Sequence, residues 1–272
     1  MDLGLQGKHA IVTGGSRGIG KAIARELARE GVDVAVVARN KADLEATARE
    51  LAAETNRRVL PLAADVTSKE QVERMVAEAA RELGGVHILV NSGSAPGGSA
   101  TATGPIETVV DEDLIEDFNV KYVGALRCAR AVIPHMKNAG WGRIINISGG
   151  NARNAGNLSG GARNAGLVHM TKTLAVQFGR HGITVNCIHP GTTRTERTPS
   201  LLAARAAQLG VAAEEAEKRD FAPDSPRGNL ICRMVDASEV AFVAVFLASE
   251  KAWAVSGELV VASGGAGRSV YY

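Results

Sequence analysis

The stretch HAIVTGGSRGIGKAIARELARE, residues 9–30, determines how the rest of the chain is interpreted. It contains a short apolar run, His9–Thr13, followed by the glycine-rich segment Gly14–Gly20. The residues that come next, Lys21–Glu30, carry apolar side chains at the three- and four-residue spacing of an amphipathic helix. The stretch therefore predicts a buried strand, a tight turn and a helix, in that order.

Three of the glycines have distinct expected roles. Gly14 permits the tight turn, Gly18 lets the backbone approach a pyrophosphate, and Gly20 allows the helix to pack closely. The first N–H groups of the helix then point at the phosphates. Because a predicted strand and helix flank the turn, a dinucleotide site is favoured over an ordinary glycine-rich turn.

The alternation of short apolar runs and helical patterns continues along the chain. Further strands are predicted at Val34–Ala38, Val59–Ala63, His87–Val90, Arg143–Ile147, Thr184–Ile188 and Glu258–Val261. Further helices are predicted at Lys41–Glu54, Ser68–Leu83, Asp111–Asn138, Ser159–Gly179 and Asp236–Ser249. This order is typical of a single α/β domain with a doubly wound, parallel, seven-stranded sheet and helices on both faces. The strand C-termini are then expected at one edge of the sheet.

Residues 190–228 depart from this alternation. They are rich in Thr, Pro, Ala and charge, and they are longer than an ordinary connection in a compact domain. We predict a substrate lid at about 192–229, with a short helix around Leu201–Leu209, within one domain that spans 1–272.

Composition limits the expected partners. The formal net charge is +2 and the basic residues are dispersed, so neither nucleic acid nor a membrane surface is expected as a partner. The three cysteines, Cys128, Cys187 and Cys232, are far apart, and no signal peptide or membrane-spanning apolar run is evident. We expect a cytoplasmic protein without disulfides or a metal site, whose partners are a small-molecule substrate and other subunits.

Several short motifs occur together along the chain: TGGSRGIG at 13–20, AADV with Asp65, NSGS at 91–94, FNV at 118–120, RIINIS at 143–148, TKTLA at 171–175 and VNCIHPGTTRT at 185–195. In this combination the chain resembles the short-chain dehydrogenase/reductase family, from about Leu5 to Gly265. The resemblance implies a Rossmann-type fold, a nicotinamide cofactor, oxidoreductase chemistry and a homotetramer or homodimer.

The resemblance also implies which residues bind the cofactor. They are Gly14, Ser16, Arg17, Gly18, Ile19 and Gly20 in the phosphate loop, Asp65 and Val66 at the adenine, Asn91 and Gly93 behind the cofactor, Asn164 at the ribose, and Pro190, Gly191 and Thr195 at the nicotinamide carboxamide. The family usually has NNAG where this chain has NSGS. The backbone course is therefore expected to persist while the side chains differ.

The end of the second strand indicates the type of cofactor. An acidic residue there would bind the ribose hydroxyls of NAD, but this chain has Ala38, Arg39 and Asn40. Arg39 and Arg17 can instead pair with a 2′-phosphate, although solvent-exposed arginines are also common. We therefore predict NADP(H).

The catalytic positions of the family are largely missing. The resemblance places its Asn at Asn119, which is retained, but its Ser at Gly149, its Tyr at Gly160 and its Lys at Asn164. Sliding the helix by one residue would bring Ser159 and Arg163 to the Tyr and Lys spacing, but it would break the match of residues 164–166 to the family's K-A-G.

Ser148, Ser159, Arg163 and Asn164 remain candidate residues at the border of the active site. None of them replaces a tyrosine acid. The two glycines at the Ser and Tyr positions also predict extra room beside the nicotinamide. Tyr271 or Tyr272 from a neighbouring subunit is a further candidate acid, against the alternative of a disordered tail.

Two functions stay open. The first is an NADP(H)-dependent oxidoreductase acting on an acceptor that does not need the tyrosine acid, such as an iminium ion, an activated alkene or an unusual carbonyl. The second is a non-redox protein of the same fold, either a lyase or isomerase or a pseudoenzyme, in which the nucleotide is structural or its site is vestigial. The retained cofactor motifs favour the first function, and the missing catalytic residues favour the second.

Overall fold

The computed structural model describes residues 1–94 and 97–267 and has the doubly wound architecture expected from the sequence. Its main sheet has seven strands, all parallel, in the order β3-β2-β1-β4-β5-β6-β9. The strands are β1 His9–Thr13, β2 Asp33–Ala38, β3 Val59–Ala63, β4 Ile88–Asn91, β5 Gly142–Ile147, β6 Ile183–Pro190 and β9 Leu259–Ala262. The single-domain, parallel α/β prediction is therefore confirmed.

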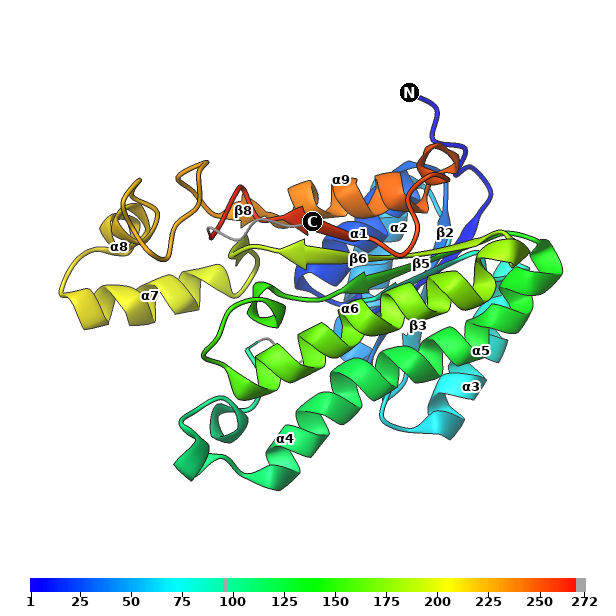
Figure 1. Ribbon diagram of the computed structural model, residues 1–272. Coiled ribbons are helices and arrows are strands. Elements are labelled where there is room, and N and C mark those ends of the chain that lie inside the picture. Colours follow the sequence, from blue (N-terminus) through cyan, green and yellow to red (C-terminus); the bar gives the residue numbers. More distant parts are fainter. Residues whose placement is uncertain (95–96, 268–272) are drawn as a thin grey trace.

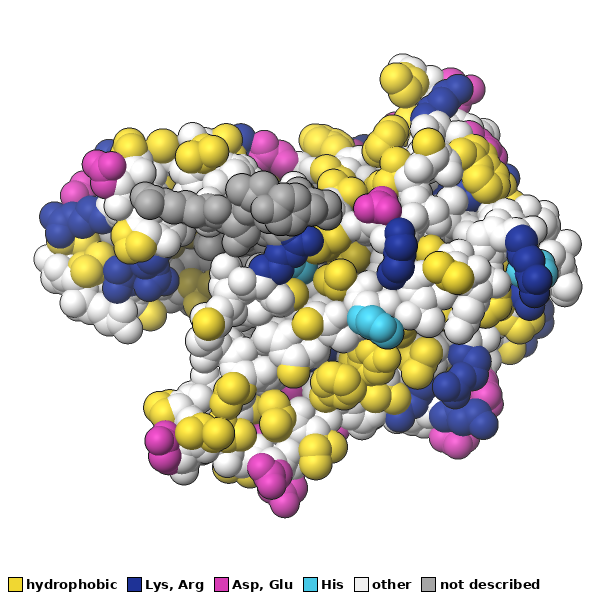
Figure 2. Space-filling model, in the orientation of Figure 1, with side chains coloured by type: hydrophobic (Ala, Val, Ile, Leu, Met, Phe, Trp, Pro, Cys, Tyr) yellow, Lys and Arg dark blue, Asp and Glu magenta, His cyan; other side chains and the backbone are white. Residues whose placement is uncertain are grey.

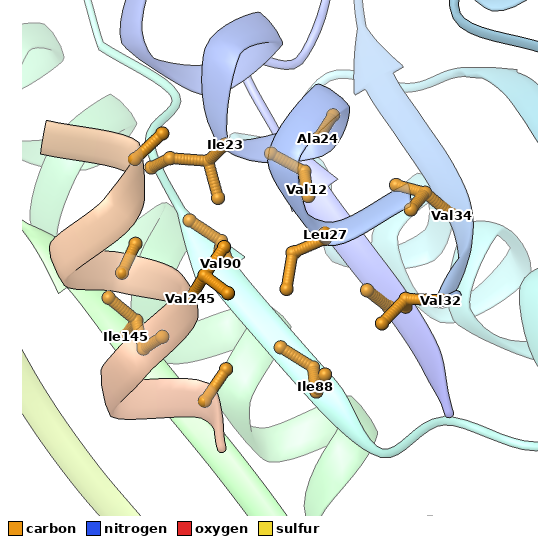
Figure 3. Close-up of a cluster of buried hydrophobic side chains, with 14 of the residues drawn as sticks. Val12, Ile23, Ala24, Leu27, Val32, Val34, Ile88, Val90, Ile145 and Val245 are labelled. Carbon is orange, nitrogen blue, oxygen red and sulfur yellow. The ribbon is translucent and has the colours of Figure 1, made fainter. Parts of the chain in front are cut away.

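Helices cover both faces of this sheet (Figure 1). One face carries α1 Gly18–Arg29, α2 Lys41–Thr55 and α9 Ala237–Ala248. The other carries α3 Lys69–Leu83, α5 Gly124–Ala139 and α6 Leu158–Phe178, with α4 Asp111–Phe118 preceding α5. Figure 3 shows the first of the two apolar cores, in which Ile23 and Leu27 of α1 and Val245 of α9 pack on Val12 and Val90 of the sheet. These side chains are nearly or fully buried, so packing fixes α1 and the glycine loop before it.

The order in which strands are added to the sheet reverses between β1 and β4. After β1 the chain adds β2 and β3 on one side of it, and then adds β4, β5, β6 and β9 on the other side, while all seven strands stay parallel. Ligands of such sheets bind beyond the carboxyl ends of the strands at this reversal. The glycine loop follows β1 and the NSGS segment follows β4, so both lie at the reversal.

One predicted helix is divided. In place of a continuous helix over 111–138, α4 ends at Phe118, a π-helical turn η3 spans Asn119–Val123, and α5 begins at Gly124. The Gly124 N–H donates to the Asn119 carbonyl, five residues back. A Cβ on Gly124 would lie 2.8 Å from a methyl carbon of Val66, so only glycine allows this close approach. The π turn rotates the residues that follow Asn119 relative to a regular α-helix.

The 192–229 segment contains more structure than expected. Besides α7 Thr198–Leu209, it holds a second helix, α8 Ala213–Asp220, which the sequence analysis did not predict. Arg205 of α7 makes a bidentate ion pair with Asp220 of α8, with nitrogen to oxygen distances of 2.9 and 3.1 Å. A two-strand parallel ladder pairs β7 Thr193–Arg194, at the start of the segment, with β8 Val235–Asp236, shortly after its end.

The region beyond the carboxyl ends of the strands is hollowed. Figure 2 shows a hollow between the lobe formed by α7 and α8 and the lobe that carries α4.

No helix in the described part of the chain is both long enough and apolar enough to cross a membrane. Within the same residues, no three His, Cys, Asp or Glu side chains are grouped as they would be around a metal ion.

Candidate active site

The glycine loop after β1 has the geometry that its sequence predicts. Gly14 has a φ of +65°, and a Cβ there would lie 2.7 Å from the Ser92 carbonyl oxygen. A Cβ on Gly20 would collide with the backbone of Gly14. The loop is thus pressed against the end of β4 and against its own helix, which leaves room for glycine alone at these two positions.

The N-terminus of α1 is bonded to an acidic side chain of the protein itself. Arg17 occupies the N-cap position without a capping side chain, and Gly18, with a φ of +57°, begins the helix. The Gly18 N–H donates to the Glu196 carboxylate at 2.9 Å. Thr195 packs its methyl group over Gly18, 3.6 Å from where a Cβ would be. The helix end therefore already holds a negative charge, as expected from its dipole and free N–H groups.

The segment after β4 is fixed to β1. Thr13 Oγ1 accepts hydrogen bonds from the N–H groups of Ser92 and Gly93, both at 3.2 Å. Asn91 is buried and donates to the Asn146 side chain of β5 at 2.9 Å. This network orders the backbone behind the expected cofactor position and uses the Asn91 side chain within the sheet.

The remaining cofactor candidates lie along the same edge. The Ser16 carbonyl accepts from Thr47, Ile19 packs on the core under α1, and Asp65 accepts twice from Thr67. The Val66 carbonyl accepts from Arg127 at 3.2 Å.

The start of the 190–195 segment is held against β9. The Gly191 N–H donates to the Ala262 carbonyl at 3.0 Å. A Cβ on Gly191 would meet the Ser263 backbone at 2.8 Å, so a larger residue would force the two segments apart. Pro190 ends β6, and the contact places the residues up to Thr195 beside the glycine loop.

Arg17 and Arg39 are both exposed at the end of the sheet where the glycine loop lies. Among residues 1–94 and 97–267, neither guanidinium takes part in an ion pair. Asn40 caps α2 by accepting from the N–H groups of Ala42 and Asp43. The two arginines are therefore available to an anionic ligand, while the Asn40 side chain is committed to the helix.

Gly149 and Asn164 are in direct contact. A Cβ on Gly149 would lie 2.8 Å from Asn164 Nδ2. Ser148 is buried and donates from its hydroxyl to the Asn164 carbonyl at 3.1 Å. The structure thus brings together the positions that the family resemblance assigns to Ser and Lys.

The room predicted at Gly160 is filled. A Cβ there would lie 2.7 Å from Asn151 Nδ2 and 2.9 Å from the Asn157 carboxamide carbon. Asn157 caps α6 by accepting from the Gly160 N–H at 2.6 Å. The expectation of extra space next to this glycine was wrong, because two asparagine side chains occupy it.

Ser159 and Arg163 are buried against α4. The Ser159 hydroxyl donates to Asp117 at 2.6 Å, and Arg163 lies 3.9 Å from the same carboxylate. Burial raises the pKa of Asp117, but the hydrogen bonds from Ser159 and Ser99 and the charge of Arg163 outweigh it and lower the pKa. Both candidates are thus held by one buried carboxylate.

The Asn119 side chain makes its hydrogen bonds to the neighbouring helices α4 and α5. Its carboxamide accepts from Arg127 at 2.9 Å and donates to Glu116 at 3.3 Å. These two hydrogen bonds are to residues of its own helix pair, and the Asn119 backbone carbonyl accepts the bond that closes the π turn. Tyr271 and Tyr272 lie outside the described residues.

Lys121 is a site residue that the sequence analysis missed. It lies in η3, is buried, and its Nζ donates to the Ser148 carbonyl at 3.2 Å. Burial and the charge of Arg163, opposed by Cys187, together lower the pKa of Lys121 to about 7. One signal could have revealed it: Lys121 precedes the buried Ala125 and Cys128 by four and seven residues, on the buried stripe of the helix.

His189, at the end of β6, completes the polar site. It is buried, and burial together with the charges of Arg153 and Lys121 lowers its pKa to about 4. Both of its ring nitrogens, and Asn164 Oδ1, lack a hydrogen-bond partner among the described residues. Together with the glycine loop, these buried polar atoms without partners fit a polar ligand such as the nicotinamide end of a dinucleotide.

Comparison with known proteins identifies the family. The short chain dehydrogenase family model matches residues 8–206. The chain belongs to the short-chain dehydrogenase/reductase family. The match includes the glycine loop, Asn119, Gly149, Gly160 and Asn164, so the unusual residues lie within the segment that defines membership.

Relatives in this family match the chain almost from end to end. The chain is 35% identical over 265 residues to the 3-oxoacyl-[acyl-carrier-protein] reductase FabG of Pseudomonas aeruginosa, covering 97% of this chain and 98% of the relative. It is 33% identical over 257 residues to the short-chain reductase protein NovJ of Streptomyces niveus, covering 94% and 92%. The L-sorbose reductase of Gluconobacter frateurii, solved with NADPH and L-sorbose, superposes with a TM-score of 0.90 at 31% identity, covering 97% and 98%.

Proposed function

We propose that the protein is an NADP(H)-dependent oxidoreductase with a non-standard active site. The observation that carries the proposal is the glycine loop, in which the close packing at Gly14 and Gly20 sets the N-terminus of α1 at the end of β1. The first N–H groups of α1, one of which already binds the Glu196 carboxylate, suit a pyrophosphate. Reductases among the relatives, including one solved with NADPH, support the same assignment.

The choice of NADP(H) rests on charge. Arg17 and Arg39 are exposed at the phosphate-loop end of the sheet, and no acidic residue follows β2. A guanidinium binds a phosphate through paired, charge-assisted hydrogen bonds. Two such groups favour the extra 2′-phosphate of NADP(H) over the bare ribose of NAD.

Bound NADPH supplies a hydride. The chain then has to hold the cofactor and the acceptor together, which contributes roughly 7–11 kcal/mol to the lowering of a reaction barrier. Loss of a positioned acid costs roughly 10²–10⁴-fold in rate, so hydride transfer survives the loss of the tyrosine for a suitable acceptor. The proposed acceptor is an iminium ion, an activated alkene or an unusual carbonyl.

The residues of the site have separate proposed roles. The phosphate loop and Thr195 hold the cofactor, and Asn164 contacts its ribose. Ser148 and Asn164 support the wall beside Gly149 through their hydrogen bond. Ser159 and Arg163 position α6 against α4 through Asp117. The 192–229 segment, with α7 and α8, is the proposed substrate lid, and a homo-oligomer is the proposed assembly.

A non-redox role is the second candidate. Two observations favour it. Gly149, Gly160 and Asn164 stand where the family has Ser, Tyr and Lys, and asparagine side chains fill the space at Gly160. In that case the protein is a lyase, isomerase or pseudoenzyme, and the nucleotide stabilises the fold.

Calorimetry followed by turnover separates the two candidates. NADPH is titrated into the purified protein, and NADPH oxidation is then followed with 2-cyclohexenone, 1,2-cyclohexanedione and a dihydroisoquinolinium ion. Binding with oxidation in the presence of one acceptor supports the proposal. Absence of binding rejects the cofactor assignment, and binding without oxidation favours the non-redox role. Deleting 270–272 tests whether the terminal tyrosines contribute, because their proposed role requires activity to fall.

A further inference from the structure

Lys121 brings an ammonium group to the carboxyl end of β5 from the side of η3. Its Nζ donates to the carbonyl of Ser148, the residue directly before Gly149. Ser148 is hydrogen-bonded to Asn164, and the Asn164 carboxamide lies beside Gly149. The cation thus reaches the end of β5 from the α4–α5 side, next to the positions where the family has its Ser and Lys.

The ammonium has no compensating carboxylate. Only 8% of Lys121 is exposed, and no Asp or Glu in the described part of the chain forms an ion pair with it. An isolated buried charge costs several kcal/mol unless it is paired. A hydrogen bond to one carbonyl offsets only part of this cost, so a methionine of similar length would be the more stable choice here.

The groups that face Lys121 are cationic or neutral. From α6 comes Arg163, which is engaged with Asp117 of α4. From β6 come the Cys187 thiol and His189, whose charge states are coupled to that of the ammonium. Burial and the repulsion from Arg163 favour loss of a proton from Lys121, and they bring its pKa to about 7. Both protonation states of the amine are therefore populated near neutral pH.

The backbone that presents Lys121 is also irregular. The π turn η3 places it, closed by the Gly124 N–H and the Asn119 carbonyl. Single π turns within helices often occur at functional sites because they redirect a side chain. The close packing of Gly124 on Val66 keeps the turn in place.

We propose that Lys121 is the proton donor of this active site, in place of the absent tyrosine and lysine. This inference rests on the proposed NADPH-dependent reduction. A bound cofactor would supply a hydride to the acceptor carbon, and reduction would leave an anion on the acceptor oxygen or on the neighbouring carbon. The Lys121 ammonium gives its proton to that atom, becomes a neutral amine, and is reprotonated from solvent.

The proposal narrows the substrate class. Hydride addition to a carbonyl or an activated alkene leaves an anion that needs a proton, whereas addition to an iminium ion gives a neutral amine directly. A cation without a partner at the site also repels an iminium ion and attracts a developing negative charge. The acceptor is therefore a carbonyl compound or an activated alkene rather than an iminium ion.

Steady-state kinetics of Lys121→Met test the role directly. With 2-cyclohexenone or 1,2-cyclohexanedione, kcat/KM is expected to fall roughly 10²–10⁴-fold, while NADPH affinity stays within about threefold. Wild-type kcat/KM should decrease as the pH rises through about 7, and this limb should vanish in the variant. The matched control is Lys172→Met, whose side chain is exposed on α6. Unchanged kcat/KM in Lys121→Met contradicts the proposal.

Chemical rescue separates a proton donor from a structural lysine. Lys121→Ala should regain activity with added ethylammonium, and the rate should rise with the concentration of the protonated amine. No rescue, in a variant whose circular dichroism and NADPH binding match the wild type, contradicts the proposal.

An NMR titration tests the lysine without turnover. The chain has nine lysines, and with ¹³Cε-labelled lysine the signal lost in Lys121→Met belongs to Lys121. That signal should titrate near pH 7, and titration above pH 9 contradicts the proposal.

Failure of the wild type to oxidise NADPH with every acceptor rejects the proposed function instead. Wild-type turnover that Lys121→Met preserves rejects this inference alone.

Discussion

The Gly18 N–H and the Glu196 carboxylate are joined by a hydrogen bond of 2.9 Å across the mouth of the glycine loop. Gly18 is the first residue of α1, and Glu196 follows Thr195 at the start of the proposed lid. An anion of the chain itself therefore lies where the phosphates of a dinucleotide are expected. Cofactor binding has to displace this carboxylate, which links the phosphate site to the position of the 192–229 segment.

Replacing Glu196 by glutamine is expected to tighten NADPH binding. The variant removes the charge that competes for the helix N-terminus, an interaction of roughly 0.3–1 kcal/mol, so Kd should fall about two- to fivefold. Isothermal titration calorimetry measures the change. The control is Glu214→Gln, which alters an exposed carboxylate of α8. A weaker or unchanged affinity would show that Glu196 does not compete.

Replacing Arg39 by alanine is expected to weaken NADPH selectively. A lost charge-assisted hydrogen bond costs roughly 1.5–3 kcal/mol, which raises the Kd for NADPH about ten- to hundredfold and leaves that for NADH nearly unchanged. Fluorescence titration with both nucleotides gives the ratio. Arg49→Ala, an exposed position of α2, serves as the control. Equal losses for both nucleotides would contradict the assignment of Arg39 to the 2′-phosphate.

Arg143 is expected to be a main determinant of stability. Its buried guanidinium lies 4.1 Å from the Trp141 ring centre and 4.2 Å from that of Trp253, and it donates to the Ser249 carbonyl. Arg143→Ala leaves a cavity between the only two tryptophans and should lower the free energy of unfolding by about 2–5 kcal/mol. Urea denaturation followed by circular dichroism measures this. A loss no larger than that of the exposed Arg180→Ala would contradict the prediction.

Stability is expected to fall in mild acid. Burial, aided by His9 and Lys8, lowers the pKa of His87 from 6.5 to about 4, and its Nδ1 accepts from the His9 N–H. Between pH 4 and 6.5, His87 is more protonated in the unfolded chain than in the folded one. The contribution of His87 to the free energy of unfolding is therefore complete above pH 6.5 and decreases as the pH falls toward 4. Melting temperatures between pH 4 and 8 should drop less steeply for His87→Gln. Parallel profiles would contradict the assignment.

The fold was accessible from local sequence patterns. The strand, glycine turn and helix at residues 9–30 form as predicted, because Gly14 and Gly20 occupy positions that admit no side chain. The order of the elements then leaves few arrangements other than a parallel, doubly wound sheet. The division at Asn119 was missed because a π turn changes the backbone by one residue without changing the apolar pattern.

The candidate site depended more on tertiary contacts. Gly160 predicted free space, but the side chains of Asn151 and Asn157, from the loop just before α6, fold back to fill it. Lys121 lies only two residues from the motif residue Asn119 and on the buried stripe of its helix, but its hydrogen bond to Ser148 forms only when η3 and β5 are brought together. The short helix α8 was missed because its eight mostly charged residues have little apolar periodicity to detect.

Transfer of deuterium from NADPH tests the central claim most directly. NADPH labelled with deuterium at either face of C4 is incubated with the wild-type protein and each candidate acceptor, and the product is analysed by mass spectrometry. The account predicts that a carbonyl or activated-alkene product gains one deuterium from only one of the two labelled cofactors. Tight binding of NADPH with no deuterium in any product would contradict the account and leave the non-redox role.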